Sequence, residues 1–150
     1  MKRTLILFSS ILFTFSAMAQ IKDPVKWSFS ATKKSDKVYE LTFTAEVEKP
    51  WHIYSQHTPK GGPVPTKFVY KVNPLIKADA SVNESSNIKT IHEEVFGVDV
   101  KYFEGKAVFT QIVNLKSAAK TNIAGTIEYM ACNNTTCMPP KKVPFDITLQ

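Results

Sequence analysis

The chain has 150 residues, of which 43% are hydrophobic, 11% aromatic and 21% charged. These proportions are typical of one globular domain, and they exclude a disordered tail and make a two-domain or multi-cofactor enzyme a poor fit. The two cysteines, Cys132 and Cys137, are too few for a disulfide-built miniprotein or for a four-thiolate zinc or iron–sulfur site.

The first nineteen residues have the pattern of a secretory signal peptide. Lys2 and Arg3 precede an apolar run from Leu5 to Phe15, and the small residues that signal peptidase accepts follow at Ala17 and Ala19. The apolar run is shorter than the ~20 residues of a membrane-spanning helix, and no cysteine follows it as a lipid-anchor site. We therefore predict export, cleavage after Ala19, and a soluble mature domain spanning residues 20–150.

The charge of the mature chain argues against nucleic-acid recognition. Without Lys2 and Arg3, 17 basic residues remain against 13 acidic ones, a net charge of +4, and all 17 are lysines. Proteins that read bases and phosphates rely on the forked guanidinium of arginine, which the mature chain lacks. The lysines are dispersed, so we interpret them as a solvated surface.

Apolar and polar residues alternate with a period of two along the mature chain, which predicts β-strands. The clearest run places Tyr39, Leu41, Phe43, Ala45 and Val47 on one face. Shorter runs lie at Trp27 and Phe29, at 68–72, at 109–113, at 123–129 and at 143–149, and turn signals lie at 61–63, 73–74, 104–105 and 139–140. Seven or eight short strands without a helical stripe favour a single all-β domain, an immunoglobulin-like β-sandwich, with a barrel as the alternative.

The cysteines lie at the mouth of a predicted hairpin. Four residues separate Cys132 from Cys137, and Asn133-Asn134 favours a turn between the strands. Opposed residues of antiparallel strands are about 4.5 to 5.5 Å apart, which suits a disulfide. Because Tyr129 has the core phase, Cys132 is expected to point outward, where a partner can reach it. The core-facing residues of the two hairpin strands are in register only if a bulge lies near Pro139-Pro140.

The residues alone leave three roles open for this pair. A structural staple is the default in an exported protein, although closing so short a loop removes only ~2 kcal/mol of unfolded-state entropy. A redox-active pair needs one accessible sulfur and a second that resolves the mixed disulfide. A Cu(I) site is the third role, because Met130 and Met138 flank the cysteines and His52, His57 or His92 could join them.

Three motifs occur in an order found in one protein family. The first is an aromatic strand, a cysteine, a short turn, a second cysteine and two prolines, at Tyr129, Cys132, Cys137, Pro139 and Pro140. The second motif is the acidic, aromatic and glycine-ended segment 92–97, which Tyr102-Phe103 follows. The third motif, which is a weaker match, is Trp-His-Ile-Tyr-Ser at 51–55. Together they resemble the N-terminal periplasmic domain of the thiol:disulfide interchange protein DsbD.

The resemblance implies an immunoglobulin-like domain that passes reducing equivalents in the periplasm. In that family a membrane-embedded donor reduces the domain by way of a thioredoxin-like domain, and the domain then reduces periplasmic thioredoxin-fold proteins. The second cysteine, matching Cys137, forms the mixed disulfides, and the first, matching Cys132, resolves them. Because the chain ends at Gln150, the resemblance implies that the membrane and thioredoxin-like domains are separate polypeptides.

The resemblance also assigns roles around the cysteines. Residues Glu94, Val95, Phe96 and Gly97 match the cap loop that shields the sulfurs, and Tyr54 and Pro139 match supporting positions. The loop between the two cysteines and the cap segment 92–97 are each one residue shorter than in the family pattern. This leaves open whether Phe96 or Val95 is the shield. Acidic side chains at 93 and 94, if close to the sulfurs, would restrain thiolate formation.

We therefore predict a thiol–disulfide oxidoreductase module in which Cys137 attacks and Cys132 resolves. We expect it to be a monomer with thioredoxin-fold partners and a membrane-embedded electron donor, and without a cofactor, metal, nucleic acid or small-molecule substrate. The alternative is a non-catalytic immunoglobulin-like module that binds a protein partner and has a structural disulfide, and the next is a Cu(I)-binding protein.

Overall fold

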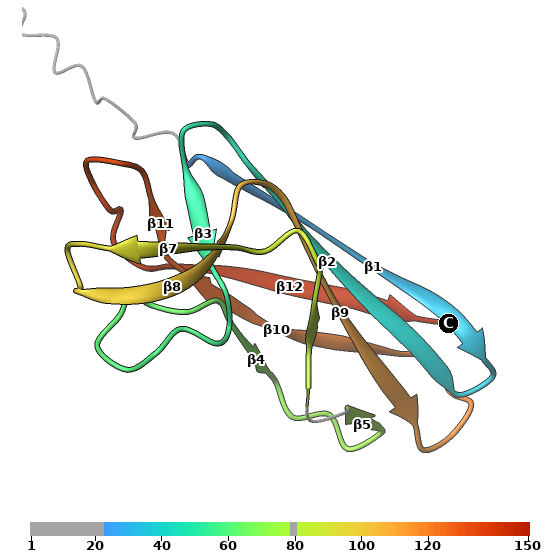
Figure 1. Cartoon of the computed structure of the whole chain (residues 1–150). Helices are drawn as coiled ribbons and strands as arrows, with labels where there is room; N and C mark the ends of the chain where they lie inside the picture. The colour runs from blue at the N-terminus through green and yellow to red at the C-terminus, as the bar shows by residue number, and fades with distance from the viewer. Residues whose placement is uncertain (1–22, 79–80) are drawn as a thin grey trace, which may run out of the picture.

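The computed structural model describes residues 23–78 and 81–150 (Figure 1). The predicted signal peptide, residues 1–19, lies outside the described residues. Within the described ranges the chain forms strands, turns and loops, and it contains no helix that is long and apolar enough to cross a membrane.

Twelve strands lie in the described part of the chain. They are β1 (Val25–Ser35), β2 (Val38–Val47), β3 (His52–Tyr54), β4 (Lys67–Tyr70), β5 (Ile76–Ala78), β6 (Asn83–Glu84), β7 (Lys89–Glu93), β8 (Val98–Phe103), β9 (Gly105–Leu115), β10 (Thr121–Tyr129), β11 (Ala131–Cys132) and β12 (Lys141–Leu149). The six alternating runs correspond to β1, β2, β4, β9, β10 and β12, except that Val72 of the 68–72 run lies beyond the end of β4 and is 98% exposed. The expected total of seven or eight strands is too low, because β3, β5, β6 and β11 have only two or three residues, too few to show an alternating pattern, and because β7 and β8 form a further hairpin.

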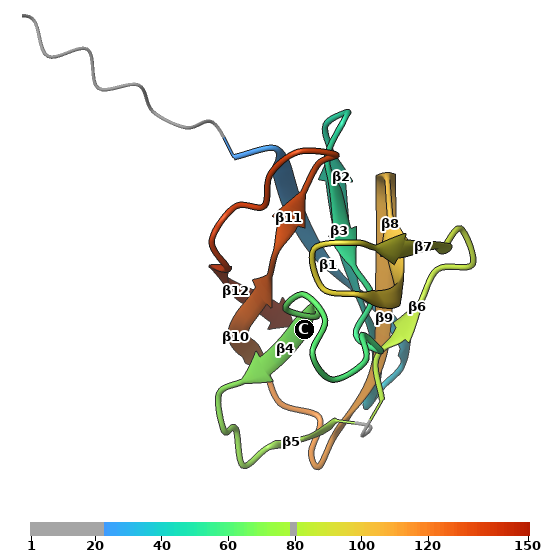
Figure 2. The same cartoon turned by 60° about the vertical axis from the view of Figure 1, so that its left-hand side comes forward.

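The long strands form two facing layers. One sheet has the order β1-β2-β9-β5, with β6 also paired to β9, and the other has the order β12-β10-β4. Figure 2 shows β4, β10 and β12 on one side of the domain and β2 and β9 on the other. All assigned strand pairs are antiparallel, and the arrangement is the predicted immunoglobulin-like β-sandwich.

Aromatic side chains fill the space between the layers. The ring centroid of Phe43 on β2 lies 4.8 Å from that of Phe68 on β4 and 5.1 Å from that of Phe145 on β12. Phe109 on β9 lies 5.3 Å from Phe68, and both Phe43 and Phe109 are completely buried. Burying one such side chain contributes about 1.5 to 3 kcal/mol to folding, so this core, which contains neither cysteine, stabilises the domain.

Gly125 on β10 leaves room for the β4 backbone and for the Phe145 ring. A Cβ atom at this position would lie 2.4 Å from the carbonyl oxygen of Val69 on β4 and 2.5 Å from Cζ of Phe145. Only a glycine lets the β4 backbone and the Phe145 ring approach β10 this closely.

A third sheet, with the order β11-β3-β8-β7, lies at one end of the sandwich (Figure 1). Side chains alternate across it, so Ala131, Ile53 and Phe103 point into the main core. The opposite face carries Cys132 and Tyr54, which belong to a second, smaller apolar cluster. This third sheet therefore joins the cysteine segment to the predicted cap segment.

Candidate functional site

A disulfide joins Cys132 at the end of β11 to Cys137. The turn between them is closed by a hydrogen bond of 2.9 Å from the Asn133 amide to the Thr136 carbonyl oxygen. The Asn133 side-chain oxygen also accepts hydrogen bonds from the backbone amides of Thr135 and Thr136, each at 2.9 Å. This short side chain holds the turn that brings the two sulfurs together, as the sequence predicts.

The strand register changes by one residue beside the disulfide. Tyr129 on β10 pairs with Lys141 on β12, whereas Cys132 is bridged to Cys137. The change lies in the stretch that contains Pro139-Pro140, where we predicted a bulge. Prolines cannot donate to the ladder, so the chain leaves the second sheet here, and β11 pairs instead with β3.

The prediction that a partner can reach Cys132 is wrong, because its side chain is only 1% exposed. The predicted phase is correct: Tyr129 and Ala131 lie in the main core, and Cys132 points away from it. The outward face, however, is covered by other residues. Cys137 is partly exposed, so it is the more accessible of the two cysteines.

The cover over Cys132 comes from β3 and β8. Tyr54 and Val100 are buried with Cys132, and Val98 and Tyr102 pack against them. In the β3–β8 ladder Tyr54 is directly opposite Tyr102. The role of β8 was missed, although Val98, Val100 and Tyr102 alternate with polar residues and carry the period-two signal of a strand.

A buried polar network lies on the same face of the third sheet. The His52 Nε2 atom lies 3.1 Å from the Tyr54 hydroxyl oxygen, which donates a hydrogen bond of 2.9 Å to Oε2 of Glu93. His52 is 6% exposed and lies directly opposite Cys132 in the β3–β11 ladder. The network therefore links the strand beside Cys132 to the last residue of β7.

Burial sets the protonation states of this network. Desolvation lowers the pKa of His52, and the Glu93 and Glu104 carboxylates act in the opposite direction. Burial and the hydrogen bond to Glu93 raise the pKa of Tyr54. At neutral pH the network holds a neutral tyrosine and favours a neutral imidazole.

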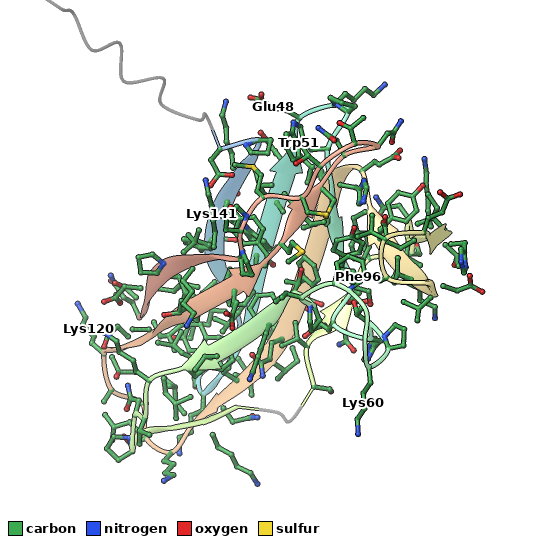
Figure 3. The ribbon with its side chains drawn as sticks, turned by 90° about the vertical axis from the view of Figure 1, so that its left-hand side faces the viewer. Glu48, Trp51, Lys60, Phe96, Lys120 and Lys141 are labelled. Carbon is green, nitrogen blue, oxygen red and sulfur yellow. A yellow bond between two sulfur atoms is a disulfide. The ribbon has the colours of Figure 1, made fainter. Side chains whose placement is uncertain are left out.

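The predicted cap segment forms the turn of the β7–β8 hairpin. The amides of Phe96 and Gly97 donate to the Glu93 carbonyl oxygen at 3.0 and 2.8 Å, and Gly97 has a φ of 66°, which favours glycine. Val95 is 80% exposed, whereas Phe96, which is labelled in Figure 3, is partly buried. Phe96 is not among the partly buried side chains that pack against the cluster of Cys132, Tyr54 and Val100, so the choice between Phe96 and Val95 as the shield stays a prediction.

The cap turn and the cysteine turn face each other across a groove of about 260 Å³. The groove is lined by His52, Ile91, His92, Glu93, Glu94, Val95, Asn133 and Asn134. Ile91 is 40% exposed, so the groove has an apolar patch on the cap side. The two motifs that the resemblance relates to each other are thus neighbours in space.

The remaining predicted residues lie around this centre. Pro139 is exposed just after Cys137, and Glu94 is exposed in the cap turn. Met130 packs on the second cluster. Among the described residues no group of three or more histidine, cysteine or acidic side chains is arranged to hold a metal ion. Copper binding through the methionines stays a prediction.

Comparison with known proteins assigns the family. The sequence profile described as "Thiol:disulfide interchange protein DsbD, N-terminal" matches residues 18–149. The chain belongs to the DsbD N-terminal family. It is a thiol–disulfide interchange domain with an immunoglobulin-like fold and a disulfide-forming cysteine pair. Among curated proteins, none matches the sequence significantly.

Two solved structures, of a ScsB and of a DsbD N-terminal domain, agree with the fold of this DsbD-type domain. The N-terminal periplasmic domain of ScsB from Proteus mirabilis has a TM-score of 0.60 and 15% identity, and covers 85% of this chain. The chain spans only 47% of that ScsB structure. The reduced DsbD N-terminal domain of Neisseria meningitidis has a TM-score of 0.52 and 16% identity, over 80% of this chain and 83% of that one. A complex of the DsbD and PilB N-terminal domains from N. meningitidis has a TM-score of 0.48 and 13% identity, covering 80% of each chain.

Proposed function

We propose that this DsbD-type domain is a periplasmic redox relay that takes electrons from a membrane-embedded donor and passes them to thioredoxin-fold proteins. The observation that carries the proposal is the unequal exposure of the two cysteines. Cys137 is partly exposed, while its disulfide partner Cys132 is buried in the small cluster on the face of the third sheet that points away from the main core. The family assignment and the periplasmic origin of the ScsB domain support the compartment.

The exchange has two steps in the direction that oxidises this domain. The Cys137 thiolate attacks one sulfur of the partner's disulfide, a mixed disulfide forms, and the partner's other sulfur leaves as a thiolate. Cys132 then loses its proton and attacks Sγ of Cys137, and the partner's remaining sulfur leaves as a thiolate. Two electrons have then passed to the partner, and the Cys132–Cys137 disulfide has formed.

Burial of Cys132 suits this resolving role. A small oxidant or an unrelated disulfide cannot reach a cysteine that is 1% exposed, so side reactions are confined to Cys137. Resolution needs no outside access, because the sulfur that Cys132 attacks is held next to it by the hairpin turn.

The reduction potential of the pair distinguishes a relay from a staple. We expect equilibration of the domain with a glutathione redox buffer to give a value near the ~−270 mV of thioredoxin or above it. A relay must exchange electrons reversibly with proteins in this range. A value well below ~−300 mV, typical of structural disulfides, would support the non-catalytic binding module instead.

Removal of the disulfide should change stability little. Closing this short loop is worth only ~2 kcal/mol in the chain-entropy model, and the aromatic core lies elsewhere. We expect the double variant Cys132→Ala/Cys137→Ala to remain folded, with a free energy of unfolding in urea lower by about 2 kcal/mol or less. A variant that is unfolded in buffer would show that the disulfide is a required staple.

A further inference from the structure

His52 is the titratable side chain directly opposite Cys132. The two residues are paired in the antiparallel ladder between β3 and β11, so their side chains leave the sheet on the same face. Directly opposed Cβ atoms in such a ladder are about 4.5 to 5.5 Å apart, within reach of an imidazole and a thiol. Both side chains are buried, at 6% and 1% exposed.

The hydrogen-bond network fixes which nitrogen of His52 carries the proton. The Tyr54 hydroxyl donates its only proton to Glu93, so its oxygen can only accept from His52 Nε2 at 3.1 Å. The neutral ring is therefore the Nε2–H tautomer, and Nδ1 has the lone pair. The imidazole ring also packs against Tyr102 on β8, at 5.0 Å between ring centroids, which holds its plane.

We propose that His52 is the proton acceptor for Cys132 in the resolving step, a role that rests on the redox function proposed above. The proton moves from Sγ of Cys132 to Nδ1 of His52 as the sulfur attacks Sγ of Cys137. The Cys132–Cys137 bond forms, and the bond from Cys137 to the partner breaks with its electron pair on the partner's sulfur. In the reverse direction His52 returns the proton to the departing Cys132 sulfur.

The charges around His52 favour this transfer. Glu93 Oε2 on β7 lies 3.8 Å from Nε2 and stabilises the imidazolium that the transfer creates. The rings of Tyr54 and Tyr102 pack against the imidazole, and Glu104 also attracts its positive charge. Burial keeps the resting ring neutral and therefore able to accept a proton.

The two steps can be separated with the aromatic disulfide dithiobis(nitrobenzoate). Reduced protein releases one coloured thiolate when Cys137 attacks, at a rate proportional to reagent concentration, and a second when Cys132 resolves, at a rate independent of it. We expect His52→Gln, which retains a donor to Tyr54, to slow the second release by about 100-fold at neutral pH, the lower end for a positioned general base. The first release should not change.

The pH dependence gives a signature that a structural role would not produce. In the wild type the second release should slow only at acid pH, where His52 is protonated, whereas in His52→Gln it should fall tenfold per pH unit from alkaline pH downward. Glu93→Gln removes the charge that favours protonated His52, so the acid midpoint should move to lower pH. The exposed His57 offers a matched control, and His57→Gln should leave both releases unchanged.

Three outcomes decide between the proposals. A second release in His52→Gln with the wild-type rate and pH profile would overturn the role of His52. If His52→Gln does not fold, an acid midpoint that does not move in Glu93→Gln would overturn it instead. The assignment of the sulfurs is tested separately by Cys132→Ala, which should release one thiolate only, and a failure there would count against the redox mechanism rather than against His52.

Discussion

Replacing Cys137 with alanine should abolish exchange with disulfide partners, while replacing Cys132 with alanine should stop the exchange at the mixed disulfide. Cys137 is the accessible sulfur, and no other described thiol can start the reaction, since the buried Cys132 is 1% exposed. Without Cys132 the attack by Cys137 still occurs, but nothing resolves the product. The covalent complex should accumulate to most of the protein, against almost none in the wild type.

Oxidised thioredoxin is a suitable probe for this trap, because it has the fold of the proposed partners. Reduced variants are mixed with it, quenched with acid, and separated by electrophoresis without reductant, where the complex runs at the combined mass. The double variant is the control and should give no complex. If Cys137→Ala forms the covalent complex and Cys132→Ala does not, the attacking and resolving roles of the two cysteines are reversed. If neither variant forms it, the disulfide is a structural staple.

The sandwich was predictable because its long strands have one buried and one solvated face. Strands β2, β9 and β10 alternate buried and half-buried residues along most of their length, so period two is visible in the sequence. Strands β3 and β11 have only three and two residues, all of them buried, and so show no alternation. They exist because a neighbouring strand pairs with them, which the local sequence does not encode.

The motifs of the candidate site were predictable from the sequence, but the side chains that cover Cys132 were not. The phase of a strand indicates which of two faces a residue takes, and this was correct for Cys132. It does not indicate whether other side chains cover that face, and here side chains of β3 and β8, two strands of the same sheet, cluster with Cys132. The polar network was missed for a related reason: His52 and Tyr54 are two apart on one strand, but their carboxylate partner Glu93 lies 39 residues beyond Tyr54.

Replacing Tyr54 with phenylalanine should expose Cys132 by loosening the β7–β8 hairpin. The Tyr54 hydroxyl connects β3 to Glu93 through a hydrogen bond to a carboxylate, at 2.9 Å. Such a bond is worth about 1.5 to 3 kcal/mol, so its loss should raise the population with an open hairpin about 10- to 150-fold. The measurement is the rate at which a maleimide alkylates Cys132 in a Cys137→Ala background.

Tyr129 provides a control of matched chemistry. Its hydroxyl also donates a hydrogen bond of 2.9 Å to a carboxylate, that of Asp23, and its side chain is 1% exposed in the main core. Tyr129→Phe should therefore lower the free energy of unfolding by a similar amount as Tyr54→Phe, yet leave the alkylation rate of Cys132 near that of the background protein. Equal acceleration by both variants would mean that Cys132 is exposed by global unfolding, and that the contact between Tyr54 and Glu93 does not hold the hairpin closed.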